Sequence, residues 1–139
     1  LGTLDIAAST IKFLQDSLRE VVVSGTGTGA FSGFPIEVSG KTGTGQVFGK
    51  NPNGTLKDDT SWFASFAPSN NPRYAVVMMV GQGGFGASTS GVGVRQIYEA
   101  IYGVSGNKII PGAALFPEGK PPTQLPKISP ATKPKETGK

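Results

Sequence analysis

The side chains best suited to binding or catalysis lie in a stretch of nine residues, from Val38 to Gln46. Lys41 supplies a positive charge, Thr42 and Thr44 supply hydroxyl groups, and three glycines lie among them. A cation beside two hydroxyls can bind a carboxylate through charge-assisted hydrogen bonds. Glycines weaken a strand, and they are kept there mainly where a ligand or another backbone approaches the main chain. The stretch therefore indicates a binding edge.

Three strands are expected to position this stretch. Val38, Val47 and Phe48 are strand formers without helical spacing, so residues 35–48 are predicted to form a strand. Residues 61–67 alternate in part, and residues 74–80 form an apolar run that predicts a buried strand. Because short loops connect the three segments, antiparallel pairing in a meander is expected.

Two helices are expected to cover this sheet. The first has its apolar residues at helical spacing, Ser9 or Thr10 as its N-cap, and a glycine-rich end at residues 25–29. The second follows Gly86 and ends at Gly103. The fold class is therefore α+β, with helices covering an antiparallel sheet. The apolar positions of the two helices are Ile11, Leu14, Leu18, Val21 and Val22, then Val94, Ile97, Tyr98 and Ile101.

Composition excludes several classes of site. The 139 residues contain no cysteine and no histidine, which excludes disulfides, thiolate metal sites, histidine-dependent triads and most zinc chemistry within the chain. Residues 1–103 hold seven basic and seven acidic residues, so the net charge of +4 belongs to the proline- and lysine-rich residues 104–139. This segment is expected to be a solvated, extended tail, with parts of it able to lie on the domain surface, and no nucleic-acid partner is expected. The missing initiator methionine suggests a processed or excised piece of a longer protein.

Two nucleotide motifs compete with the binding edge. A Walker loop would need a glycine where Pro35 stands, and its lysine would open a helix instead of lying in a strand. Gly81, Gly83 and Gly86 fit the dinucleotide pattern between a strand and a helix. No second strand follows to complete a βαβ unit, so a dinucleotide-binding fragment remains only an alternative.

The order of these segments resembles a known family. Lys-Thr-Gly is the third motif of penicillin-binding proteins and class A β-lactamases, and residues 38–46 are similar to the Gly-Lys-Thr-Gly-Thr-x-Gln strand of monofunctional, class B transpeptidases. Residues 21–28 resemble the family's helix that ends in a Gly-Thr-Gly-Thr loop. Residues 61–68, 74–80 and 90–103 resemble its next two strands and its closing helix. The resemblance implies that residues 1–103 are the C-terminal portion of the transpeptidase domain, a partial domain of the penicillin-binding and serine β-lactamase-like fold, with residues 104–139 as a tail.

The resemblance also assigns roles at the strand. In this family a serine attacks the bond between two terminal D-alanines of a peptidoglycan stem peptide, or a β-lactam that mimics it. Lys41, Thr42 and Thr44 would bind the substrate carboxylate, and the backbone N–H of Thr44 would be an oxyanion donor, which makes Lys41 and Thr44 the catalytic candidates. Gly43 and Gly45 would leave room for the ligand, and Gln46 would contact its backbone. Trp62 is expected to pack instead of touching ligand.

The nucleophile motif of the family has no match at the expected place. Ser9-Thr10-Ile11-Lys12 fits Ser-x-x-Lys, but it precedes the first helix, whereas the family's serine lies more than a hundred residues upstream. The chain alone is therefore expected to be inactive, and its predicted partner is the upstream part of the same protein, which would also pair with residues 74–80 and leave them a bare apolar edge here.

The resemblance further implies no cofactor, and a location on the outer face of the bacterial cytoplasmic membrane, anchored by an N-terminal segment absent from this chain. A β-lactam sensor or serine β-lactamase of the same fold is an alternative, as is a non-enzymatic Gly/Thr-rich domain.

Overall fold

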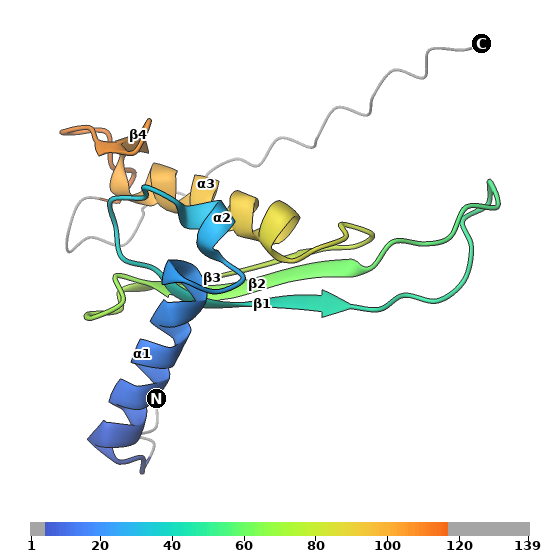
Figure 1. The fold of residues 1–139 in the computed structure, drawn as a ribbon. Helices are drawn as coiled ribbons and strands as arrows, with labels where there is room; N and C mark the ends of the chain where they lie inside the picture. The colour runs from blue at the N-terminus through green and yellow to red at the C-terminus, as the bar shows by residue number, and fades with distance from the viewer. Residues whose placement is uncertain (1–4, 117–139) are drawn as a thin grey trace.

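A computed structural model describes residues 5–116, which form a three-stranded sheet with helices packed on it (Figure 1). This arrangement confirms the predicted α+β class, with an antiparallel sheet and covering helices. The elements are, in chain order, α1 (Ala8–Val23), α2 (Thr28–Phe31), β1 (Ser39–Gly45), β2 (Thr60–Ala67), β3 (Tyr74–Val80), the π-helix η1 (Ala87–Gly91), α3 (Val92–Tyr102), β4 (Val104–Ser105) and β5 (Lys108–Ile109).

The sheet is the predicted meander, in the order β1-β2-β3 with both pairs antiparallel. In its register Thr42 lies opposite Phe63, and Phe63 opposite Met78. β1 is shorter than the expected strand of residues 35–48, because it ends at Gly45. The chain beyond it forms a long connection that extends past the end of the sheet before it returns as β2 (Figure 1).

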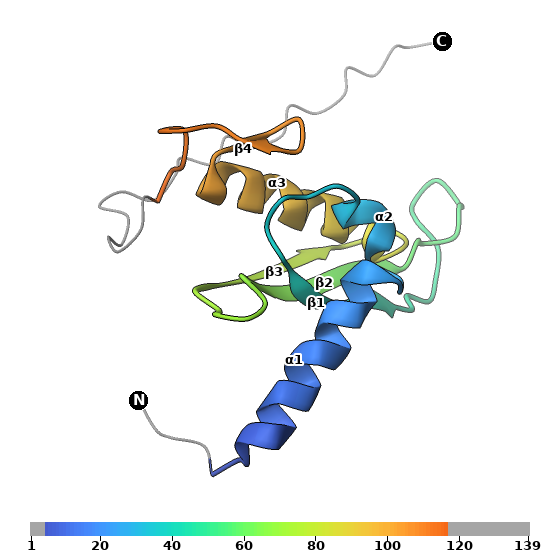
Figure 2. The same ribbon diagram turned by 60° about the vertical axis from the view of Figure 1, so that its left-hand side comes forward.

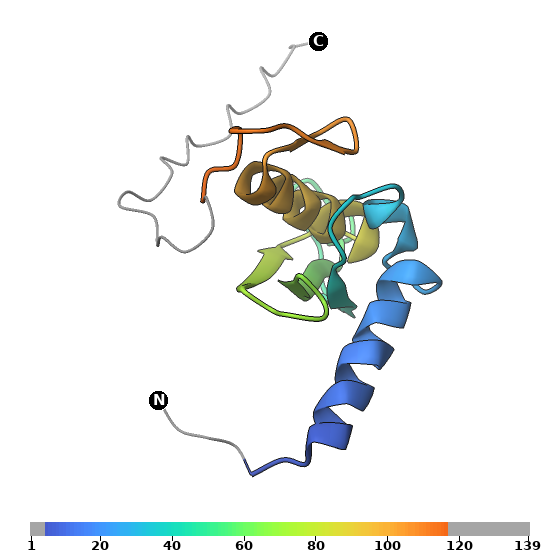
Figure 3. The same cartoon turned by 90° about the vertical axis from the view of Figure 1, so that its left-hand side faces the viewer.

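The core lies between one face of the sheet and the helices α2 and α3 (Figure 3). Alternate residues of β2 point into it, and Phe63 is fully buried there beside Phe31, with ring centroids 5.5 Å apart. Val94 and Tyr98 of α3 are also fully buried. The Tyr98 hydroxyl lies 3.1 Å from Ser65 Oγ, which satisfies both polar groups inside the core. β2 is therefore the central support of both neighbouring strands.

Helix α1 packs on β1 from its middle, at Gln15, to its C-terminal end. Ser39 Oγ donates a hydrogen bond to the Gln15 carbonyl at 3.3 Å, and Arg19 donates to the Val38 carbonyl at 3.0 Å. The N-terminal half projects away from the sheet (Figure 2), so that Ile11 and Leu14 of the apolar stripe remain 40% and 47% exposed.

The predicted N-cap of α1 is wrong. The helix begins at Ala8, and Ala7 occupies the cap position with no side-chain hydrogen bond. Ser9 and Thr10 lie one residue or more inside the helix, and the backbone N–H of Thr10 already bonds to the Ala7 carbonyl at 2.9 Å.

Strand β3 has the predicted bounds but not the predicted burial. Val77 is 63% and Met79 is 57% exposed, because they point away from the helix layer and β3 forms an edge of the sheet. No further strand pairs with it among residues 5–116. The alternative expectation, a bare apolar edge, describes this strand correctly.

The second helix ends as predicted, and the chain then folds back onto it. Gly103 closes α3 in the left-handed conformation with φ of 65°. Val104 is buried, Leu115 N–H donates to the Ala100 carbonyl at 3.0 Å, and Phe116 packs on Tyr74. Residues 104–116 are thus folded on the domain instead of extended, whereas residues 117–139 of the predicted tail lie outside the described residues. Within the described part of the chain, no helix has the length and apolar character of a membrane span.

Candidate active-site strand

The predicted site residues follow one another along β1. Lys41, Thr42, Gly43, Thr44 and Gly45 lie within the strand, and Gln46 follows it directly. β1 is an edge strand, so one side of its backbone has no strand neighbour among the described residues. Unpaired backbone groups at such an edge can hydrogen-bond an extended ligand.

The register separates the site side chains onto two faces. Lys41 lies opposite Ala64, which points to the face without helices. Thr42 lies opposite Phe63, which points into the core, so Thr42 is on the helix side. Successive strand residues alternate in this way, which places Thr44 on the same face as Thr42. The lysine and the threonines can therefore meet at one ligand only around the free edge of β1.

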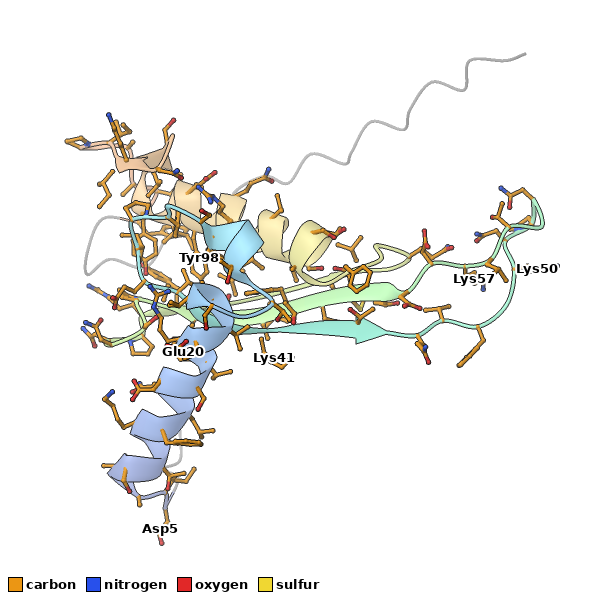
Figure 4. All side chains as sticks on the ribbon, in the orientation of Figure 1. Asp5, Glu20, Lys41, Lys50, Lys57 and Tyr98 are labelled. Carbon is orange, nitrogen blue, oxygen red and sulfur yellow. The ribbon has the colours of Figure 1, made fainter. Side chains whose placement is uncertain are left out.

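The Lys41 side chain is arranged along that edge. It is exposed (Figure 4), and its Nζ donates to the Thr42 carbonyl at 2.8 Å. The ammonium group thus lies beside the strand backbone instead of extending straight away from the sheet. A carboxylate bound at the edge would find this charge next to the threonine backbone.

Thr26 contacts the candidate site strand, although the sequence did not indicate this. Its Oγ1 lies 2.7 Å from Thr42 Oγ1, in a hydrogen bond that joins the loop after α1 to the strand. The sequence analysis treated residues 25–29 only as the end of a helix. Gly-Thr pairs occur at residues 25–28, after α1, and again at residues 43–44, in β1. This repetition was the one sequence signal that could have linked Thr26 with Thr42.

The glycines of β1 have packing roles. A Cβ at Gly40 would stand 2.7 Å from a Phe63 ring carbon and 2.8 Å from the Ala64 carbonyl oxygen. A Cβ at Gly43 would stand 3.1 Å from the Cβ of Trp62, its neighbour in β2. Only Gly45 has ordinary space around it, with no atom closer than 3.8 Å. Room for a ligand remains a prediction for Gly43 and Gly45, whereas the close approach of β2 already requires a glycine at Gly40 and leaves little space at Gly43.

The remaining two predicted contacts lie near the strand. Gln46 is exposed just beyond the end of β1. Trp62 is 41% exposed on the face shared with Lys41 and Gly43. The ligand contact of Gln46 and the packing role of Trp62 both stay predictions.

Ser9, the serine of the Ser-x-x-Lys match, lies far along α1 from the candidate strand. Ser9 lies in the first turn of α1, at the end that projects away from the sheet, and Lys12 forms an exposed ion pair with Asp16 at 2.6 Å. Two buried serines of the sheet hold neighbouring elements together: Ser39 Oγ lies 2.9 Å from Ser69 Oγ, and Ser61 Oγ lies 2.8 Å from Ser90 Oγ.

A cavity lined by aromatic side chains lies beside Tyr74 at the start of β3. It measures about 350 Å³ and is lined mainly by apolar side chains, with Tyr74, Tyr102 and Phe116 among them. Burial, with the neighbouring Tyr98 and Tyr74 hydroxyls, raises the pKa of Tyr102 to about 12. Burial also raises the pKa of Tyr98, although its hydrogen bond with Ser65 opposes the change. These phenols stay protonated near neutral pH and cannot serve there as bases.

The glycine pattern of residues 81–86 does not form a dinucleotide site in the described chain. β3 runs antiparallel to β2, and the turn leads into the π-helix η1. A dinucleotide fold needs parallel strands around a crossover helix. Gly86 instead packs directly on the sheet.

The chain has clear relatives of known class. Residues 1–102 match the penicillin-binding protein transpeptidase domain. The chain is 34% identical over 106 residues to a peptidoglycan D,D-transpeptidase FtsI homolog of Mesostigma viride, covering 73% of this chain and 17% of that protein. It is 36% identical over 86 residues to the peptidoglycan D,D-transpeptidase MrdA of Escherichia coli K12, covering 56% of this chain and 13% of that protein.

Solved structures agree with the sequence relatives. Pseudomonas aeruginosa PBP2, solved in complex with WCK 5153, superposes with a TM-score of 0.65 and 25% identity, over 82% of this chain and 24% of that one. A D,D-transpeptidase domain from Eggerthella lenta superposes with a TM-score of 0.50 and 32% identity, over 68% of this chain and 21% of that one. The chain thus spans less than a quarter of the length of each of these relatives. It belongs to the penicillin-binding protein transpeptidase family, and the strand with Lys41 and the threonines lies within the matched residues.

Proposed function

We propose that this chain is the C-terminal part of a serine D,D-transpeptidase that cross-links peptidoglycan stem peptides and is acylated by β-lactams. The observation that carries the proposal is the free edge of β1, where Lys41 Nζ bonds to the Thr42 carbonyl and Thr42 bonds to Thr26. A site that places one cation and several hydroxyls along an unpaired strand edge suits an extended peptide that ends in a carboxylate.

The clamp acts on the terminal carboxylate of the stem peptide. The Lys41 ammonium would turn from the Thr42 carbonyl to the carboxylate, and the Thr42 and Thr44 hydroxyls would donate to its oxygens. Thr42 can donate its proton outward while its oxygen accepts one from Thr26 at 2.7 Å, because a hydroxyl both donates and accepts. Thr26 would thereby orient the Thr42 hydroxyl toward the ligand.

The backbone of the same strand acts on the reacting carbonyl. A serine from the upstream part of the protein attacks this carbonyl, its proton passes to a base of that part, and the carbonyl oxygen becomes negative. The Thr44 N–H would donate to this oxygen together with the N–H of the serine. Such donors act because they are already in position when charge develops. Collapse of the intermediate then expels the terminal D-alanine as the amine, and a second stem peptide supplies the amine that takes up the acyl group.

The proposed enzyme includes an upstream part in addition to residues 1–139. Val77 and Met79 leave the outer face of β3 apolar and exposed, and an upstream strand of the same protein would pair with this edge. The upstream part would also bring the serine, and its N-terminal anchor would hold the enzyme on the outer face of the cytoplasmic membrane.

The test uses the complete protein and compares benzylpenicillin with its carboxylate ester. Hydrogen bonds to charged groups have a net worth of about 1.5 to 3 kcal/mol, so Lys41→Ala is expected to lower the second-order acylation rate constant at least tenfold for the free acid. The ester should react equally slowly with parent and variant. Lys50→Ala, which removes an exposed lysine beyond the end of β1, is the matched control and should leave both rates unchanged.

Two results would contradict the proposal. Free-acid acylation of Lys41→Ala at the parental rate would show that the carboxylate is bound elsewhere. If no β-lactam acylates the parent protein, the proposed transpeptidase function itself is contradicted. Product analysis separates transfer from hydrolysis, and dominant hydrolysis would place the protein among β-lactamases of this fold.

A further inference from the structure

Gly86 stands against the backbone of the site strand, although it lies more than forty residues away in the sequence. It is buried at the start of η1 with ordinary helical dihedral angles, φ −55° and ψ −44°. A Cβ at this position would lie 2.6 Å from the carbonyl oxygens of both Gly43 and Trp62, and 3.0 Å from the Gly43 nitrogen. Backbone freedom therefore does not explain this glycine, and the close approach to β1 and β2 does.

The turn that carries Gly86 is tied to the sheet by hydrogen bonds. Ser61 Oγ, on β2, lies 3.1 Å from the Phe85 carbonyl oxygen and 2.8 Å from Ser90 Oγ, and it accepts the Ser90 N–H at 3.1 Å. The Gly84 N–H donates to the Asp59 carbonyl at 2.9 Å. These bonds lie on both sides of Gly86 and are partly or fully buried at Ser61. The turn consequently cannot withdraw from the strand without breaking them.

The contact lies next to the predicted oxyanion donor. Gly43 precedes Thr44 directly, and Ser61, which holds the turn, is the register partner of Thr44 in β2. A shift of the Gly43 peptide group moves the Thr44 N–H with it, because the peptide unit is planar. The same contact also supports Trp62, the partner of Gly43.

We propose that Gly86 is a positioning residue for this reaction: its missing side chain lets the turn after β3 rest on the Gly43 backbone and so fixes the place of the Thr44 N–H. This inference rests on the proposed function, since it concerns the donor of the same site. The glycine turn of residues 81–86 would thus support the backbone of β1 at Gly43.

The first experiment is Gly86→Ala in the complete protein. The added methyl meets two carbonyl oxygens at distances that packed atoms do not tolerate, so either β1 moves or the ties of the turn break. Misplacement of a reacting group by about 1 Å can cost about a hundredfold in rate. We expect the limiting acylation rate constant for benzylpenicillin to fall at least tenfold, while the dissociation constant of the preceding non-covalent complex changes less than threefold.

Two alanine controls separate positioning from stability. Gly81→Ala meets no atom within 4 Å and should behave as the parent. Gly91→Ala, in the same η1 segment, would crowd the Ala30 and Phe63 side chains at 3.1 and 3.3 Å instead of the strand backbone. It should lower the thermal unfolding midpoint while leaving the limiting acylation rate within threefold of the parent.

A second variant applies if Gly86→Ala does not fold. Ser61→Ala removes the tie that holds the turn and adds no volume, so the limiting acylation rate should fall at least threefold with binding unchanged. The inference is overturned if the parent is acylated normally and the folded variants, Gly86→Ala or Ser61→Ala, keep the parental limiting rate, or if Gly91→Ala loses as much rate as Gly86→Ala. A parent that is not acylated would instead overturn the proposed function.

Discussion

Thr42 and Thr44 share a face of β1 but have different surroundings. The Thr42 hydroxyl is already held by Thr26 at 2.7 Å, and its side chain is half-buried. Thr44 is exposed, and its proposed contribution is divided between a hydroxyl for the carboxylate and a backbone N–H for the oxyanion. Because one substitution can remove the hydroxyl and keep the N–H, Thr44 allows these two contributions to be measured apart.

Thr44→Val is expected to lower the second-order acylation rate constant by about two- to tenfold, which is less than Lys41→Ala. A neutral hydrogen bond has a net worth of about 0.5 to 1.5 kcal/mol, and valine keeps both the β-branched shape and the N–H. Stopped-flow acylation by benzylpenicillin measures the loss, with Thr55→Val on the exposed connection after β1 as the control. A loss larger than that of Lys41→Ala would mean that the hydroxyl, and not the charge, dominates the clamp.

At the scale of single elements, the two edge strands of the sheet, β1 and β3, differ in composition. β1 carries glycine and threonine, whereas β3 carries Val77 and Met79 outward and has no charge or proline along its seven residues. Sheet edges of soluble proteins are usually protected by charges, prolines or covering elements. The edge of β3 has none of these among the described residues, so it is the edge that another chain segment should cover.

Residues 1–139 expressed alone are accordingly expected to dimerise or aggregate through β3. Val77→Lys places a charge on the exposed face of this edge and should shift the population toward monomer. Ile97→Lys, which charges an exposed position of α3, is the control and should not. Sedimentation velocity measures the distribution, and a stable, cooperatively folded monomer of the parent chain would contradict the expectation.

Strand periodicity and turn residues were enough to predict the meander and the end of α3 at Gly103. The N-cap at Ser9 or Thr10 failed because both residues are good caps by type, while the helix began two or three residues earlier, at Ala8, without any side-chain cap. The pairing of Thr26 with Thr42 and the contact of Gly86 with Gly43 were out of reach, because both depend on how separate elements pack. Sequence could indicate that a glycine is unusual, but not which backbone lies against it.

At the scale of the whole molecule, the region after Gly103 divides into a folded and an undescribed part. Val104 is buried, and the chain up to Phe116 packs on α3 and Tyr74. Arg95 fastens this region to the rest, since its guanidinium donates to the Ser32 carbonyl at 3.0 Å and also bonds to Asn107. The residues that follow are rich in proline and lysine and offer few apolar side chains to bury.

Deletion of residues 119–139 from the complete protein is therefore expected to leave acylation by a fluorescent penicillin unchanged. Deletion of residues 104–139 should instead lower the unfolding midpoint by several degrees, because it removes Val104 and Phe116 from their packing sites. Gel labelling and thermal unfolding measure both truncations. More than tenfold loss of labelling in the shorter deletion would show that the tail is a structural arm.

The open edge of β3 also bears on the timing of synthesis. If the upstream part of the protein pairs with it, β3 and the proposed ligand-binding strand β1 are both made after the strand that covers β3. At about 5 to 20 residues per second, a ribosome needs roughly 7 to 28 s for these 139 residues, during which the earlier part waits with its own pairing edge exposed. The proposed catalytic site would then be assembled only when these later-made strands reach the earlier part, so a protein stalled or cleaved before β1 would carry its nucleophile without the Lys41 strand.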